Sequence, residues 1–204
     1  MNEQIDRELT RIASALQTPD AGDAAQRFAE RAAAADLIDV AYGELETPVG
    51  PVVVACTRQG LVRVAYADAP HWVLAQLAKR VSPRILRLPG GVDDVRRQLD
   101  EYFAGRRDDF ELTLDWRLTD GFQRRVLRNT ATIPRGQVST YTEIARAAGS
   151  PRAARATGNA LGANPLAIVV PCHRVVRTGG ALGGYGGGLD AKRYLLSLEG
   201  ALKD

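Results

Sequence analysis

Residues 140–161, with the sequence TYTEIARAAGSPRAARATGNAL, decide the fold of this chain. Thr140, followed three positions later by Glu143, is a capping box that begins a helix. A glycine ends this helix, and a Ser-Pro pair begins a second one, with Pro151 at its first position and its end near Leu161. Two helices joined by a short glycine-containing turn form the helix-turn-helix pattern.

The second helix carries small side chains and arginines. Its residues include Arg152, Ala153, Ala154, Arg155, Ala156 and Gly158. Helices that read the major groove usually present long polar side chains to the bases, and this helix has few of them. Its surface suits the phosphate backbone and a narrow minor groove of DNA. Close packing against another helix is the alternative interpretation.

A continuous apolar run, Leu166–Val170, follows the helix pair and predicts a buried strand. The strand leads into Pro171, Cys172 and His173. A cysteine beside a histidine on a rigid strand is a candidate nucleophile with a lowered thiol pKa. Neighbouring side chains on a strand point to opposite sides, so proton transfer between them needs a bridging water or a turn. A merely buried, unreactive cysteine is the other interpretation.

A glycine-rich loop, Gly179–Gly188, follows the cysteine and contains one aromatic residue, Tyr185. No Lys-Ser/Thr pair follows the glycines, so the loop is not a phosphate-binding P-loop. We interpret it as a flexible flap beside Cys172. The chain then forms a final predicted helix, Asp190–Leu198, with Glu199 directly after it.

The preceding part of the chain has the pattern of a smaller mixed domain. Short runs rich in Val, Tyr and Ile predict a β-meander. The predicted strands are Ile38–Leu45, Pro51–Thr57 and Leu61–Tyr66, with a further strand at Phe110–Trp116. The predicted helices are residues 5–16, 20–35, 70–81, 92–104 and 121–130. We therefore divide the chain into a helical appendage (1–37), an α/β domain (38–117) and a carboxy-terminal domain (118–204).

The composition is that of an ordinary globular protein, with 204 residues, 45% of them hydrophobic and 25% charged. No apolar run approaches the roughly 20 residues that a membrane-spanning helix requires, and the polar first residues do not form a secretory signal. The two cysteines, Cys56 and Cys172, cannot form a disulfide framework, so we expect a reducing, cytoplasmic location. Neither they nor His71 and His173 have zinc-ligand spacing, so no metal site is expected.

The two parts of the chain carry opposite charge. Residues 121–204 have twelve basic and four acidic side chains, a net charge of +8, whereas residues 1–120 have a net charge of −5. A basic carboxy-terminal part suggests contact with a polyanion, and a solvated basic face is the alternative, which composition alone does not separate from the first.

Two motifs resemble a known family, the O6-alkylguanine-DNA alkyltransferases (methylated-DNA–protein-cysteine methyltransferases). The first is Val-Pro-Cys-His-Arg-Val at 170–175, preceded by Asn164-Pro and followed by the Gly/Tyr loop. The second runs from Tyr141 through Ser-Pro-Arg-Ala-Ala-Arg, which ends at Arg155. The resemblance extends from about Ile38 to Leu202 and leaves only the appendage unmatched.

The resemblance implies an α+β fold. A small ribonuclease-H-like domain of sheet and helices would precede a helical, winged helix-turn-helix domain that carries the active-site cysteine. It also implies a monomer without a cofactor that binds double-stranded DNA through the minor groove, with no membrane partner. The protein would flip out an alkylated guanine and keep its alkyl group, one molecule per lesion. O4-alkylthymine is a second candidate lesion.

The same resemblance suggests roles for individual residues. Cys172 would accept the alkyl group, with His173 as its water-bridged base and Glu199 holding the imidazole. Asn164 would support the active-site turn, Tyr141 would assist the departing guanine, and Arg155 would fill the space that the flipped base leaves. The remaining candidates line the pocket or belong to the following helix: Val170, Pro171, Tyr185, Gly186 and Lys192.

Departures from the family pattern concern the loop and the second helix. Gly186 stands where several members have a serine, and Gly187 and Gly188 follow it, so we expect a looser loop whose preference for lesion size does not follow the family pattern. Asn159 replaces a residue that is often small. Two other functions compete: a non-catalytic lesion sensor, which the intact cysteine disfavours, and a multiple-turnover thiol hydrolase with Cys172 in a triad.

Overall fold

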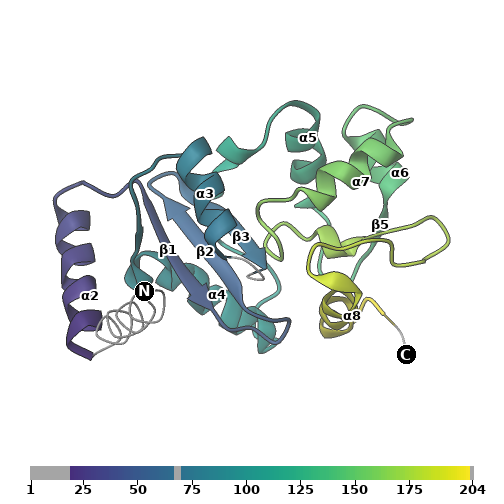
Figure 1. Cartoon of the computed structure of the whole chain (residues 1–204). Coiled ribbons are helices and arrows are strands. Elements are labelled where there is room, and N and C mark those ends of the chain that lie inside the picture. The colour runs from purple at the N-terminus through teal and green to yellow at the C-terminus, as the bar shows by residue number, and fades with distance from the viewer. Residues whose placement is uncertain (1–18, 67–69, 203–204) are drawn as a thin grey trace, which may run out of the picture.

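The computed structural model describes residues 19–66 and 70–202, arranged in two halves (Figure 1). A β-sheet with helices forms the amino-terminal half, and short helices dominate the other half. Helix α2 (Pro19–Ala34) lies beside the sheet, on the side away from the carboxy-terminal half. It confirms the second predicted helix of the appendage, whereas the first, residues 5–16, lies outside the described residues. No described helix has the length and apolar character needed to cross a membrane.

The predicted meander is confirmed. Strands β1 (Val40–Leu45), β2 (Val52–Thr57) and β3 (Gly60–Tyr66) pair in antiparallel fashion. A short strand that the sequence did not predict, β4 (Ile85–Arg87), pairs in parallel with β1. The described sheet therefore has the order β3-β2-β1-β4.

Helices cover both faces of this sheet, because the strands alternate buried side chains between the two faces (Figure 1). Val53 and Val62 face α3 (Pro70–Arg80), which confirms the helix predicted at 70–81. Val54 faces α4 (Asp93–Phe103), which confirms the helix predicted at 92–104. The 3-10 turn η1 (Pro89–Val92) directly precedes α4, and a second one, η2 (Trp116–Leu118), comes before the carboxy-terminal half.

The outer edge of β3 is covered by segments that are not strands. Leu61 forms a parallel bridge with Leu114, and this bridge is the only pairing in the segment predicted as a strand at Phe110–Trp116, so that prediction is wrong. Further along the same edge, the backbone N–H of Val64 donates to the Pro165 carbonyl at 2.8 Å. The Val64 carbonyl accepts from the N–H of Ala167 at 3.1 Å, so the carboxy-terminal half completes this edge.

The carboxy-terminal half contains the predicted helix-turn-helix. Its elements are α5 (Gly121–Thr130), β5 (Ser139–Thr140), α6 (Tyr141–Ala147), α7 (Ala154–Gly162), η3 (Cys172–Arg174), β6 (Val175–Val176) and α8 (Gly188–Leu198). The capping box is confirmed, because the Thr140 hydroxyl accepts from the Glu143 N–H and the Glu143 carboxylate accepts from the Thr140 N–H. Helix α7, however, begins at Ala154 and not at Pro151, because a turn that closes between Ser150 and Ala153 comes first.

The apolar run Leu166–Val170 is buried as expected, but it is a turn and not a strand. Ile168 has a positive φ of 70°, and the Val170 N–H donates back to the Leu166 carbonyl at 2.8 Å. The side chain of Asn164 completes the turn, accepting from the Leu166 N–H at 3.0 Å and donating to the Val170 carbonyl at 2.9 Å. Local bonds thus satisfy buried backbone groups that a strand would pair with a neighbour.

Candidate active site

A cavity of about 630 Å³ opens between the helix-turn-helix and the glycine-rich loop. Its lining includes seven of the residues that the sequence predicted: Tyr141, Ala154, Arg155, Gly158, Cys172, Tyr185 and Gly186. Among the described residues around it, Val170 and Pro171 are buried but do not line it, and Arg152 and Ala153 line a separate hollow near the start of α7. Arg177 lies in the lining and was missed, because nothing in its sequence context marks it.

Cys172 lies at the start of the 3-10 turn η3 and is 8% exposed. Burial raises the pKa of its thiol, and the hydrogen bond that the Asn164 amide donates to Sγ at 3.2 Å only partly opposes this effect. The expectation of a lowered thiol pKa is therefore wrong for the resting protein. The thiol carries its proton until another group removes it.

His173 is fully buried beside the cysteine and is bonded through its Nε2 to Glu199 Oε1 at 2.9 Å. A carboxylate only accepts hydrogen bonds, so Nε2 carries the proton and donates. Burial lowers the pKa of His173 against the opposing effect of Glu199, so the ring is neutral. Its Nδ1 is then a bare acceptor, and it has no hydrogen-bond partner among the described residues.

Glu199 forms the C-cap of α8 and accepts bonds from three side chains. Besides His173, Arg174 donates through Nε at 2.9 Å and through a terminal nitrogen at 2.8 Å, and the hydroxyl of Tyr102 donates at 2.6 Å. Burial alone would raise the pKa of Glu199, yet these bonds outweigh it and lower the pKa to about 2. The carboxylate is therefore charged and fixed.

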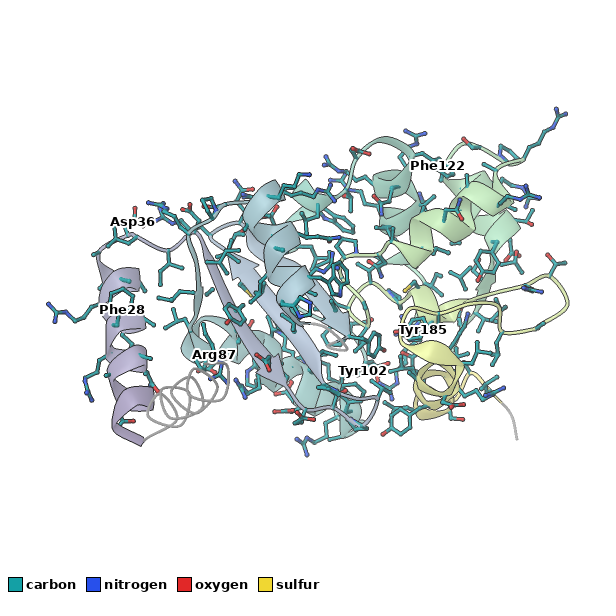
Figure 2. The ribbon with its side chains drawn as sticks, viewed as in Figure 1. Phe28, Asp36, Arg87, Tyr102, Phe122 and Tyr185 are labelled. Atoms are coloured by element: carbon teal, nitrogen blue, oxygen red, sulfur yellow. The ribbon has the colours of Figure 1, made fainter. Side chains whose placement is uncertain are left out.

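The sequence did not predict a role in the site for Tyr102 or Arg174. Arg174 directly follows the Cys-His pair, which is a usable sign, whereas Tyr102 lies on α4 in the other half of the molecule. Figure 2 labels Tyr102 and Tyr185, and both lie where the two halves meet. The site therefore draws on both domains.

The arginine of the second helix is free to reach outward. Arg155 is exposed at the rim of the cavity, and no hydrogen bond or ion pair holds its side chain to the described residues. The neighbouring residues Ala154 and Gly158 have small side chains or none, so little projects from the helix surface around Arg155. This geometry matches a helix that approaches DNA closely while one long cation projects from it.

Family models match both halves of the chain. The DNA-binding domain of 6-O-methylguanine DNA methyltransferase matches residues 121–201, and the ribonuclease-like domain of the same protein matches residues 40–116. The chain belongs to the 6-O-methylguanine DNA methyltransferase family. Its α+β fold is thus a ribonuclease-like domain followed by the DNA-binding domain that contains Cys172.

Curated relatives of this methyltransferase family support the assignment. The methylated-DNA–protein-cysteine methyltransferase of Mycobacterium tuberculosis is 42% identical over 164 residues, covering 78% of this chain and 91% of its own. That of Methanosarcina barkeri is 38% identical over 158 residues, covering 78% and 96%. Among solved structures, Mycobacterium tuberculosis OGT in complex with DNA has a TM-score of 0.68 at 39% identity, covering 78% of this chain and 92% of that one.

Proposed function

We propose that this methyltransferase reverses alkylation of guanine in DNA by moving the O6-alkyl group irreversibly onto its own Cys172. One observation carries the proposal: Cys172 lines a cavity that residues of the second helix of the helix-turn-helix also line. A cavity of about 630 Å³ lies in the range of small-molecule sites, so it has room for one flipped base.

His173 and Glu199 activate the thiol in this mechanism. The free Nδ1 of the neutral imidazole receives the thiol proton through a bridging water, and Glu199 stabilises the imidazolium that forms. The thiolate attacks the alkyl carbon, so that the S–C bond forms while the C–O6 bond breaks. The electron pair of the broken bond leaves with guanine, which takes a proton from the Tyr141 hydroxyl. The proton held by the imidazolium returns through water to Tyr141, so that both side chains end neutral.

The product explains why one molecule serves one lesion. A thioether has no acyl carbonyl that water attacks, so the alkyl group stays on Cys172. Asn164 keeps its place by bonding both Sγ and the Val170 carbonyl, which fixes the sulfur relative to the turn. We assign it a positioning role.

Double-stranded DNA is the partner of this domain, and α7 supplies the contact surface. We propose that α7 enters the minor groove and that Arg155 takes the space of the flipped nucleotide. Arg152, Ala153 and Ala156 would contact the backbone beside it.

We also propose the division of the chain at residues 37 and 117, a monomeric state and action in the cytoplasm. Both described cysteines, Cys56 and Cys172, are free thiols, which suits a reducing compartment.

Intact mass measurement after incubation with duplex DNA carrying O6-methylguanine tests the proposal. One added methyl group, mapped to Cys172, is the expected result, and a second duplex with O4-methylthymine measures the lesion range. Repeated turnover would instead establish a thiol hydrolase, and DNA binding without any mass change would establish a lesion sensor.

A further inference from the structure

A tyrosine of the amino-terminal half supports the wall of the alkyl-acceptor cavity from outside. Tyr66 is the last residue of β3, and its hydroxyl lies 3.0 Å from the hydroxyl of Tyr185. The two rings meet edge to face, with centroids 5.8 Å apart and an interplanar angle of 79°. Tyr185 lines the cavity, whereas Tyr66 does not, so Tyr66 contacts the wall and not the space inside.

The ring of Tyr66 also lies against the backbone of the loop. A Cβ placed on Gly187 would lie 2.3 Å from Cζ of Tyr66, far inside van der Waals contact. Glycine is therefore required at this position as long as the Tyr66 ring is present. The tyrosine and the glycine form one fitted contact between the two domains.

The other end of the loop is held as well. The buried Nζ of Lys192 donates to the carbonyls of Leu182 and, at 3.4 Å, Gly184. The loop is thus fixed before Tyr185 by Lys192 and at Tyr185 by Tyr66. Three glycines at 186–188 predict a loose loop from composition alone. In the structure, Lys192 holds Leu182 and Gly184, and the Tyr66 ring lies against Gly187.

The contact between the two tyrosines is largely sheltered from water. Burial raises the pKa of Tyr66 to about 12, although the bond from Tyr185 acts in the opposite direction. Burial also raises the pKa of Tyr185. Both hydroxyls are therefore neutral in the cell, and the bond between them does not change with physiological pH.

Tyr185 in turn faces the reactive pair. Its ring lies edge-on to His173, with centroids 6.2 Å apart. His173 follows Cys172 in the chain, and Tyr185 lines the same cavity as Cys172. A movement of the Tyr185 ring changes the width of the cavity beside the sulfur. Whatever fixes this ring sets how large a group fits between it and Cys172.

We propose that Tyr66 is a positioning residue that limits the size of the alkyl group accepted by Cys172. This inference rests on the proposed alkyl transfer and adds a determinant of substrate size from the amino-terminal domain. Tyr66 touches neither the lesion nor the reacting atoms. It acts by holding Tyr185 through one hydrogen bond and one ring contact.

The test compares Tyr66→Phe with wild type on two duplexes, one carrying O6-methylguanine and one carrying O6-benzylguanine. The variant keeps the ring and loses only the hydroxyl. We expect the benzyl-to-methyl rate ratio to rise about threefold to tenfold, the range that the loss of one neutral hydrogen bond permits. Tyr42→Phe is the matched control. It removes a hydroxyl from β1 of the same sheet, but Tyr42 packs with Val53 and Val62 on the face that α3 covers, away from Tyr185.

A second measurement does not need activity. Amide hydrogen exchange at residues 182–188 should quicken in Tyr66→Phe and stay at the wild-type rate in Tyr42→Phe. If wild type transfers no alkyl group at all, the proposed function fails, while the exchange result still decides whether Tyr66 holds the loop.

A substitution at Gly187 provides an independent test of the same contact. Gly187→Ala should slow transfer from both duplexes, because its Cβ collides with the Tyr66 ring. Adding Tyr66→Leu removes the ring atoms involved and should restore part of the rate. The inference is overturned by an unchanged rate ratio in Tyr66→Phe, by equal slowing on both duplexes, or by unchanged exchange of the loop.

Discussion

Replacing Glu199 with glutamine gives the sharpest test of the buried cluster that Glu199 forms with Arg174 and His173. The change keeps the size of the side chain and removes the negative charge to which Arg174 and His173 are both hydrogen-bonded. Arg174 is 5% exposed, so it would be left as a buried cation without its carboxylate partner. Breaking a buried pair in this way costs about 3–5 kcal/mol. For a chain of this size the melting temperature should fall by about 6–20 °C.

The same substitution should slow alkyl transfer at pH 7 by about tenfold or more, measured below the melting temperature of the variant. Without Glu199, the imidazolium that forms during thiol deprotonation loses its stabilising charge. The deficit should persist up to about pH 9, because burial raises the pKa of the Cys172 thiol and the thiol still needs a base to remove its proton.

Stability should change with pH as well. The pKa of Glu199 is about 2 in the folded protein, below its ordinary value of 4.5, so its contribution is complete above about pH 4.5 and is lost as pH falls toward about 2. Glu199→Gln should lack this part of the acid unfolding profile. Glu111→Gln, at an exposed carboxylate, is the control. Wild-type rates between about pH 6 and pH 9, together with an unchanged melting temperature, would refute this account of the cluster.

Three further outcomes are expected. Cys172→Ala should retain DNA binding and accept no methyl group; label on Cys56, whose pKa burial raises to about 11, would contradict the assignment of the acceptor. Arg155→Ala should slow transfer from duplex DNA far more than transfer from free O6-benzylguanine, since only the duplex requires base flipping, and equal losses would point to a folding defect. Removal of residues 1–37 should leave the transfer rate unchanged or raise it slightly at low salt, because these residues carry a net charge of −3, the wrong sign for attracting DNA; a folded but inactive product would show that the appendage is needed.

Local chemistry made much of the fold predictable. The Thr140–Glu143 capping box, the alternation of the meander and the apolar faces of the helices all depend on residues close in sequence. Short elements carry too little pattern, which explains why β4, with three residues, was missed. The run at 166–170 shows a different limit, because continuous hydrophobicity indicates burial but does not separate a strand from a buried turn.

The site was predictable where its residues form a motif and not where they meet only through folding. Cys172 and His173 are neighbours in the chain, and the predicted bond from His173 to Glu199 is present. Tyr102 is 97 positions from Glu199, and Tyr66 is 119 positions from Tyr185. No local sequence pattern predicts either contact, because each forms only when the chain folds. The raised pKa of Cys172 was also beyond reach, because it depends on how completely the tertiary structure covers the sulfur.

The covered edge of β3 has a consequence for separating the two domains. The carboxy-terminal half supplies Pro165 and Ala167 as backbone partners for Val64, and these partners leave when the chain is cut between the domains. The isolated amino-terminal domain would then expose unpaired N–H and C=O groups on a strand rich in valine, which favours strand addition between molecules. Expressed alone, this domain should aggregate, so the turn before the reactive cysteine also protects the whole chain against self-association.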